Sequence, residues 1–355
     1  YQLDFTFPNI LTDAPVAVKG DFISRSSYKS QFSVSSTGRK IFAVTIPAVH
    51  YTFTGYYARS RAMYGEFQPG SNPVSLNVTY DKGTASAEGW LNYITVNAFR
   101  ELKMDGSQMH FRYRSSGGKK IVEFNLSDAS KNTEIWEVTR NREIRKVVNL
   151  QREAGNIQFR ILADTLYREF IAFNNEEYYS PPEWEEIENQ NLHGLGPQDM
   201  IIITKEQYIN ESQKLADLHR EYDGHKVFVV TDEQVYHEFS AGKSDPSAIR
   251  NFVKMIYDKS NATDSLKYLL LFGDGSYDNQ NSAESPYLIT YQSDASFHYT
   301  RSFVSDDFFG LLDSKDHIEG TPSGLIDIGI GRFPVNNSEE AQSVVNKVYR
   351  YMDSD

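Results

Sequence analysis

The sequence predicts an α+β multidomain protein: an antiparallel β-sandwich or jelly-roll-like domain, followed by an α/β domain with an open parallel sheet. The first observation is length, because 355 residues exceed what one ordinary hydrophobic core accommodates. The second is a front half rich in short stretches of alternating apolar and polar residues. The third is a back half in which continuous apolar stretches alternate with residues spaced as on one helix face.

Residues 1–173 are expected to form the β-rich domain. An alternating, strand-like pattern is expected over residues 74–80, 91–96 and 121–126. Further strands are expected at residues 40–46, 109–113, 133–138, 145–150, 157–162 and 167–173. Clusters of Gly, Ser, Asn and Asp separate these stretches, and no helical pattern of similar length competes with them. Many short strands at this spacing favour an antiparallel sandwich.

Residues 174–197 are expected to be a linker. The segment combines a run of Asn and Glu, a Ser-Pro-Pro sequence and a Gly-Leu-Gly-Pro sequence. These residues interrupt both the strand and the helix periodicity. The linker therefore separates the β-rich domain from the α/β domain.

Residues 198–355 are expected to form the α/β domain. Buried strands are predicted at residues 199–204, 226–231, 268–272 and 327–331. Helix starts are predicted by a capping box from Thr204 to Gln207, by Asp245 before Pro246, and by Asn337 with Glu340. Buried strands that alternate with helices predict a parallel sheet covered on both faces. Ligands of such sheets gather beyond the carboxyl ends of the strands.

Composition excludes several classes of function. The formal net charge of −12 argues against nucleic acid as a partner, because phosphate binding needs clustered Lys and Arg. The sequence contains no cysteine, so it offers no disulfide, no thiolate metal site and no cysteine nucleophile. It has no apolar run of 18 residues, which argues against a transmembrane segment. It begins without Met, and we expect a mature or excised chain whose export signal was removed.

Aspartates gather in the segments that follow the third predicted strand. They are Asp274, Asp306, Asp307, Asp313, Asp316 and Asp327. Carboxylates at one sheet edge repel each other unless a cation or hydrogen bonds offset the charge, and calcium prefers such oxygen ligands. The alternative is a set of solvated aspartates that form turns. No Glu stands at the twelfth position from Asp274, which excludes an EF-hand.

Three strings carry a resemblance to a known family. They are KYLLLFGDGSYDN at 267–279, SDDFFGLLD at 305–313 and DIGIGRFP at 327–334. Together they resemble the gingipain-type (C25) cysteine peptidase family. The strings QNLHGL at 190–195 and TEIWEV at 133–138 are similar to the sortase branch of that family, which serves the type IX secretion system. The resemblance covers essentially the whole chain.

The resemblance implies a caspase-like fold for the α/β domain and a cysteine-type endopeptidase for the full-length protein. Family members act at the outer membrane or cell surface of Gram-negative bacteria. The sortase branch cleaves C-terminal sorting domains from secreted cargo and joins the cargo to lipopolysaccharide. Partners would be this protein cargo and other surface proteins of the secretion system. The catalytic Cys and His of the family follow the stretch that matches residues 332–334 and its helix, so this chain is expected to lack both and to be inactive alone.

The resemblance also implies calcium. Asp274, Asp313 and Asp327 match the positions of the family's metal ligands, so a calcium site is expected there. Two functions therefore stay open. The chain is the front part of a surface peptidase or sortase, or it is a non-catalytic module for adhesion or cargo recognition.

Overall fold

The protein is described by a computed structural model. It covers residues 1–353 except 115–117, 119, 164–166, 175–177, 179, 181–183, 185, 262–263, 280–286 and 319–322. The chain divides into two compact units, Tyr1–Thr52 with Tyr56–Glu185, and Phe53–Gly55 with Glu186–Asp355. The boundary between them falls in the segment expected as a linker, part of which lies outside the described residues.

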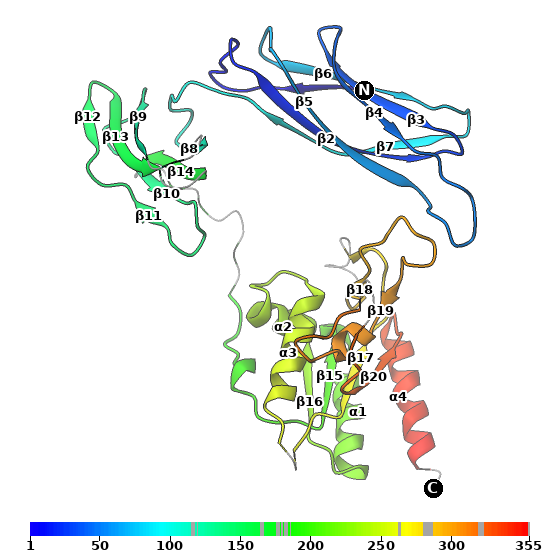
Figure 1. The fold of residues 1–355 in the computed structure, drawn as a ribbon. Helices are drawn as coiled ribbons and strands as arrows, with labels where there is room; N and C mark the ends of the chain where they lie inside the picture. Colours follow the sequence, from blue (N-terminus) through cyan, green and yellow to red (C-terminus); the bar gives the residue numbers. More distant parts are fainter. Residues whose placement is uncertain are drawn as a thin grey trace. The chain divides into compact units, whose positions relative to one another are not determined.

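The first unit begins with two antiparallel sheets that share one core (Figure 1). One sheet has the order β1-β6-β3-β4, and the other has the order β5-β2-β7. Their strands are β1 (Gln2–Phe5), β2 (Val16–Arg25), β3 (Ser30–Ser36), β4 (Arg39–Ile46), β5 (Arg59–Phe67), β6 (Val74–Asp81) and β7 (Glu88–Asn97). Every second residue of β2 is buried, from Val16 to Ser24, which is the pattern of a strand with one face on a core.

The rest of the first unit forms a second pair of antiparallel sheets, ordered β11-β10-β14-β8 and β12-β13-β9. The strands are β8 (Gln108–Arg114), β9 (Lys120–Leu126), β10 (Thr133–Glu137), β11 (Arg145–Lys146), β12 (Gln151–Glu153), β13 (Asn156–Ala163) and β14 (Tyr167–Asn174). The core of this pair shares no residue with the core of the first pair. The antiparallel fold is confirmed, but the unit contains two sandwich cores where one was expected.

The second unit is built on a parallel sheet with the order β16-β15-β17-β20. The strands are β15 (Met200–Thr204), β16 (Val227–Thr231), β17 (Tyr268–Phe272) and β20 (Gly329–Phe333). A small antiparallel pair, β18 (Tyr291–Gln292) and β19 (Val304–Ser305), lies in the segment between β17 and β20. The continuous apolar runs predicted this sheet because both of its faces are covered.

Helices cover both faces of the parallel sheet (Figure 1). The helices α2 (Asp232–Phe239) and α3 (Pro246–Asp258) pack on one face, and α1 (Ile209–Tyr222) and α4 (Ser338–Met352) pack on the other. Side chains of β17 alternate between them: Leu269 and Leu271 meet α2 and α3, whereas Leu270 and Phe272 meet α1 and α4. The predicted α/β fold is confirmed.

Helix starts were predicted with mixed success. Asp245 caps α3 with Pro246 at its first position, and Asn337 caps α4 by accepting the Glu340 N–H at 3.0 Å. The capping box at Thr204 is wrong, because β15 runs through Thr204 and its hydroxyl donates to the Phe272 carbonyl instead. A real capping box opens α2, a helix that the sequence did not predict.

Two predicted strands are displaced or shortened. The strand expected at residues 327–331 lies two residues later, at Gly329–Phe333, and therefore includes Arg332. The strand expected at residues 145–150 contains only Arg145–Lys146. Among the described residues, no helix is both long and apolar enough to cross a lipid bilayer.

Candidate functional site at the carboxyl edge of the parallel sheet

The strand order places a topological switch point between β15 and β17, because the chain moves from β15 to β16 on one side and later to β17 on the other. In open α/β sheets the carboxyl ends of the strands at such a point form the usual ligand site. Here the two strand ends are joined by the Thr204 hydroxyl, which donates to the Phe272 carbonyl oxygen at 3.2 Å. The Ser212 hydroxyl of α1 donates to the Thr204 hydroxyl at 3.0 Å. These two hydrogen bonds join the carboxyl ends of β15 and β17 to each other and to α1.

Asp274 lies at this edge, immediately after β17 and Gly273. Its main-chain N–H donates to Val335 O at 3.1 Å, and its carbonyl accepts from Leu288 N at 2.8 Å. Its carboxylate accepts from Gly275 N at 2.7 Å and from the Asn336 side-chain amide at 3.1 Å. Asp274 thus ties the end of β17 to the segment that leads into α4.

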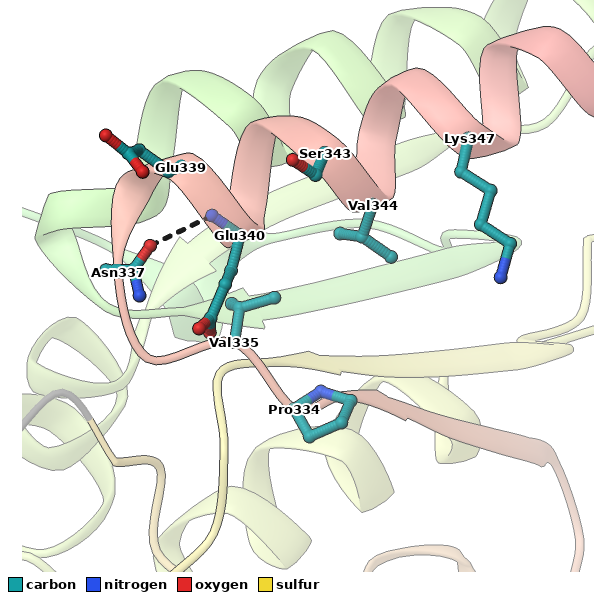
Figure 2. A pocket seen from close by; sticks show the side chains of 8 residues that line it. All are labelled: Pro334, Val335, Asn337, Glu339, Glu340, Ser343, Val344 and Lys347. Carbon is teal, nitrogen blue, oxygen red and sulfur yellow. Dashed lines mark hydrogen bonds between the residues drawn. The ribbon is translucent and has the colours of Figure 1, made fainter.

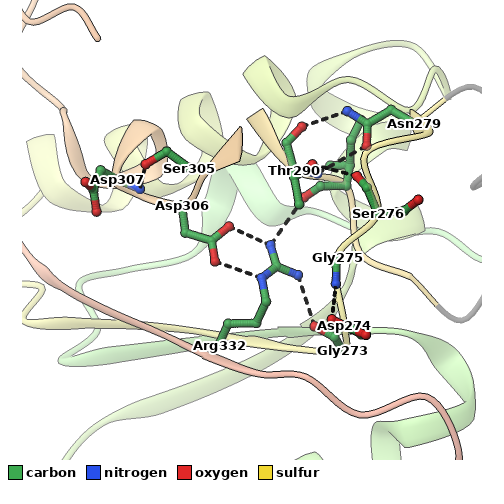
Figure 3. Close-up of polar contacts among 11 residues, drawn as sticks. Gly273, Asp274, Gly275, Ser276, Asn279, Thr290, Ser305, Asp306, Asp307 and Arg332 are labelled. Atoms are coloured by element: carbon green, nitrogen blue, oxygen red, sulfur yellow. Dashed lines mark hydrogen bonds and ion pairs between the residues drawn. The ribbon is translucent and has the colours of Figure 1, made fainter. Parts of the chain in front are cut away.

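Arg332 is the centre of the polar network at the edge (Figure 3). Its guanidinium donates two hydrogen bonds to the Asp306 carboxylate, from Nε at 2.8 Å and from Nη2 at 2.7 Å. It also donates to Gly273 O at 3.0 Å and to Ile289 O at 3.4 Å. Only 12% of the Arg332 side chain is exposed, so the pair is largely withdrawn from water.

The Arg332 network joins the three strings that carry the family resemblance. Gly273 belongs to the string at 267–279, Asp306 to the string at 305–313, and Arg332 to the string at 327–334. The planar guanidinium of Arg332 donates four hydrogen bonds here, two to a carboxylate and two to carbonyls, whereas a Lys ammonium has only three N–H groups. These strings therefore meet at one residue.

Hydrogen bonds to Thr290 hold the loop after Asp274 at the same edge. The Asn279 side-chain amide donates to Thr290 O at 2.7 Å, and the Thr290 hydroxyl donates to Ser276 O at 2.8 Å. Gly275 lies so near that a Cβ built on it would be 2.6 Å from the Thr290 methyl carbon. Glycine is required at this position by close approach rather than by a turn.

The predicted metal ligands do not lie together. In the parallel ladder Tyr268 pairs with Gly329 and Phe272 pairs with Phe333. Asp274 follows the last of these pairs, whereas Asp327 precedes the first, so the two residues lie at opposite ends of the strands. With about 3.3 Å of rise per residue, the four residue steps of this ladder alone place its two ends roughly 13 Å apart.

Asp327 and Asp313 lie near each other at the amino edge of the sheet. The Asp327 carboxylate accepts from Leu312 N at 2.9 Å and from the Tyr257 hydroxyl at 3.4 Å. Burial, followed by the nearby charges of Asp327 and Asp313, raises the pKa of Tyr257. Asp313 is exposed, and its N–H donates to Asp316 at 3.1 Å.

The three aspartates do not fit one calcium ion. Calcium takes six to eight oxygen ligands within about 2.6 Å, and carboxylates at two edges of a sheet cannot share such a shell. Across the described parts of the chain, no group of three or more His, Asp or Glu side chains is arranged to hold a metal. Of the predicted ligands, only Asp313 and Asp327 can act on the same ion.

The pairing of Arg332 with Asp306 was not predicted from the sequence. The sequence suggested that the aspartates as a group need a cation to offset their charge. The charge of Asp306 is offset by the guanidinium of Arg332. The available signal was the arginine itself, because an Arg next to an apolar run that becomes a half-buried strand needs a partner.

A second polar cluster anchors the segment that enters the unit. The Glu238 carboxylate on α2 accepts from Leu192 N at 2.6 Å, from His193 N at 3.1 Å and from the Gln190 side chain at 3.0 Å. The His193 ring also lies 2.6 Å from Glu238 and stacks on Phe239. Burial opposes ionisation, but the hydrogen bonds from Leu192, His193 and Gln190 outweigh it and lower the pKa of Glu238 to about 2.

A cavity of about 530 Å³ runs along the start of α4, on the side of β20 (Figure 2). It is lined by Pro334, Val335, Asn337, Glu339, Glu340, Ser343, Val344 and Lys347. A second cavity of about 520 Å³ also borders β20, at Gly329, Gly331 and Phe333 among others. In the described sheet β20 has a strand neighbour on one side only.

The comparisons with known proteins agree with this architecture. The family model described as "Peptidase family C25" matches residues 193–355. A crystal structure of dimeric latent PorU from Porphyromonas gingivalis matches with a TM-score of 0.83 and 25% sequence identity. The match covers 99% of this chain and 35% of that chain, so the present chain spans about a third of its length. No curated protein sequence matches the chain.

The family match begins at His193, in the segment that Glu238 anchors, and includes the parallel sheet, its helices and the Arg332 network. The same three strings that resembled the family in the sequence are the ones that meet at the edge of the sheet. The α/β unit of this chain, over residues 193–355, belongs to peptidase family C25, the gingipain-type cysteine peptidases.

Proposed function

We propose that this chain is the N-terminal part of a surface cysteine endopeptidase of the sortase branch, which removes C-terminal sorting domains from proteins exported by type IX secretion. The observation that carries the proposal is the similarity to PorU over 99% of this chain. It includes the β-rich unit as well as the peptidase-like unit. A protein that shared only the peptidase fold would match over the second unit alone.

The proposed chemistry needs a thiolate and a base. Cysteine peptidases activate a Cys with a neighbouring His, and the thiolate attacks the scissile carbonyl carbon. Because the 355 residues contain no cysteine, we place the nucleophile in a longer protein of which this chain is a part. The chain alone would then be inactive.

The role proposed for the α/β unit is that of a scaffold. Its carboxyl edge is held by the Arg332 network, and in the part of the chain that the structure describes β20 has one open edge for a further strand. Residues Gly329 and Gly331 carry no side chain that would hinder such pairing. A catalytic Cys and His on added strands would meet an edge that is already rigid, which favours a fixed geometry for the attack.

The partners proposed here follow from that role. The protein substrate would be secreted cargo that ends in a sorting domain, and the site of action would be the outer surface of a Gram-negative cell. Other surface proteins of the secretion system would be neighbours of the enzyme. These proposals are supported by the similarity to PorU and by the family membership.

The test is a cleavage assay on the longer protein encoded by the gene. Its substrate is a reporter fused to a C-terminal sorting domain from the same organism. We expect cleavage at the junction, abolished by iodoacetamide and by Cys→Ser at the cysteine that iodoacetamide modifies. Binding of the reporter without thiol-dependent cleavage would favour the non-catalytic cargo-recognition module instead.

A further inference from the structure

The outward face of the sheet β5-β2-β7 in the first sandwich carries exposed aromatic rings. In the register of this sheet Tyr64 lies opposite Lys19, Tyr93 lies opposite Asp21, and Trp90 lies opposite Ile23. The alternate residues of β2, including Val18 and Phe22, fill the core, so these three rings all lie on the face turned away from it. The exposed fractions are 56% for Tyr64, 40% for Tyr93 and 41% for Trp90.

Hydrogen-bonding groups stand between the rings. The Asn92 side-chain amide donates to the Asp21 carboxylate at 2.9 Å, beside Tyr93. The Tyr64 hydroxyl donates to Glu66, and the Lys19 ammonium lies 5.9 Å from the centre of the Tyr93 ring. Ring faces therefore alternate with donors and acceptors whose positions are already set by contacts with one another.

The charges on this face are nearly balanced. The face carries two basic residues, Lys19 and Arg25, and three acidic residues, Asp21, Glu66 and Glu88. Arg25 forms an ion pair with Glu88 at 3.5 Å. Such a face has no basic field to attract a nucleic acid, an acidic polysaccharide or an anionic membrane. The balance suits a ligand that is polar but uncharged.

The pattern also differs from the usual protein interface. The core of a protein–protein interface is a contiguous apolar patch depleted in charged residues. Here each ring is separated from the next by a charged or amide side chain, as at Tyr64, Lys19 and Tyr93. A sugar ring needs this mixture, because its C–H face stacks on an aromatic ring while its hydroxyl groups at the rim form hydrogen bonds.

We propose that the face formed by Tyr64, Trp90 and Tyr93 binds a neutral polysaccharide. Trp90 and Tyr93 lie three residues apart on β7, which corresponds to roughly 10 Å, the length of about two sugar units. Tyr64 lies across β2 from Tyr93, two strand spacings or about 10 Å away. The ligand lies across the strands, with its sugar rings on the aromatic side chains and its hydroxyl groups on Asp21, Asn92 and Glu66.

The test is affinity electrophoresis of the 355-residue chain in native gels that contain dextran, mannan, xyloglucan or galactomannan. We expect slower migration in at least one of the four gels, with little change at high ionic strength because no ion pair with the ligand is involved. The double variant Trp90→Ala, Tyr93→Ala should lose at least about tenfold in apparent affinity, the effect of about 1.4 kcal/mol. Trp90→Tyr, which keeps a ring, should retain most of the binding.

The control is Tyr28→Ala, which removes a 66%-exposed ring in the turn between β2 and β3 and should bind like the wild type. Thermal melts of all variants show that the sandwich is still folded. Normal migration in all four gels would overturn the proposal, as would binding that survives the double substitution. Loss of binding at high salt would show a charged ligand and would overturn it as well. Retention on immobilised peptides alone, lost in the double variant, would assign the face to a protein partner.

Discussion

Arg332 and Asp306 form a bidentate ion pair at the carboxyl edge of the parallel sheet, with N–O distances of 2.7 and 2.8 Å. Arg332 is in β20, and Asp306 precedes the short 3-10 helix η4 (Asp307–Gly310). The same guanidinium also holds the carbonyls of Gly273 and Ile289. Asp306 lies in the segment that connects β17 to β20. The ion pair therefore holds this part of the connecting segment against the parallel sheet.

Replacement of Arg332 tests this role. Arg332→Lys keeps the positive charge, but a Lys ammonium cannot form the two parallel hydrogen bonds to the Asp306 carboxylate. The substitution should lower the free energy of unfolding by about 2 kcal/mol. Asp306→Asn leaves the guanidinium without its counter-ion and should have a similar effect. Urea unfolding at neutral pH measures both. The exposed Arg350→Lys on α4 is the matched control, with an expected change under about 0.5 kcal/mol.

The Arg332 and Asp306 substitutions should also be non-additive. Once one substitution has broken the ion pair, the second substitution has no ion pair left to remove. The double variant should therefore lose less unfolding free energy than the sum of the losses in the two single variants. Additive effects would contradict a direct role of the pair.

Gly275→Ala tests the close packing of the loop after β17. The added methyl would lie 2.6 Å from the Thr290 methyl carbon, and Thr290 cannot move freely because Asn279 and Ser276 hold it. We expect a loss of about 1–3 kcal/mol in stability, measured by chemical unfolding. Gly196→Ala is the matched control, because a Cβ there meets nothing within 4 Å. Equal effects of the two substitutions would refute the packing argument.

Glu238 should make the stability of the α/β unit depend on acid pH. The hydrogen bonds at this carboxylate outweigh its burial and lower its pKa from the ordinary 4.5 to about 2. A lowered pKa stabilises the folded state above the unfolded-state value, and this contribution is lost as the pH falls through about 2. Glu238→Gln should therefore cost roughly 2–3 kcal/mol at neutral pH and progressively less between pH 4.5 and pH 2.

The measurement for Glu238 is the difference in unfolding free energy between the wild type and Glu238→Gln at several pH values. Glu221→Gln, an exposed substitution on α1, serves as the control. A difference that stays constant down to pH 2 would show that the carboxylate charge is not what stabilises the segment.

Calcium remains a prediction from the family resemblance, and the geometry separates its predicted ligands. Asp313 and Asp327 lie at the amino edge of the sheet and Asp274 at the carboxyl edge. If the site is at the amino edge, millimolar calcium should raise the melting temperature by several degrees, and EGTA should reverse the shift. The shift should disappear in Asp313→Asn and persist in Asp274→Asn. The reverse pattern would place the ion at the carboxyl edge.

The parallel sheet was predictable because burial on both faces leaves a continuous apolar run, as in Tyr268–Phe272. The starts of α3 and α4 were predictable because their caps are made by neighbours in sequence, Asp245 with Ser247 and Asn337 with Glu340. The start of α1 was not, since the Thr204 hydroxyl bonds to Phe272, a residue 68 positions away. Local patterns predict local contacts.

The candidate site was only partly predictable for the same reason. Asp274 was recognised as a strand-end residue, which it is. The grouping of Asp274 with Asp327 is not seen in the structure, because Asp274 follows the carboxyl end of β17 whereas Asp327 precedes the amino end of the parallel strand β20. Arg332 and Asp306 are 26 positions apart in the sequence, and no period in the sequence encodes that contact.

The proposal that the catalytic thiol lies outside residues 1–355 is tested most directly by assaying the 355-residue chain beside the longer protein, with the same sorting-domain reporter. We expect reporter cleavage by the longer protein that iodoacetamide abolishes, and no cleavage by residues 1–355, which contain no cysteine. Cleavage by the 355-residue chain that persists after iodoacetamide treatment would contradict it, because the catalytic group would then lie within these residues and would not be a thiol.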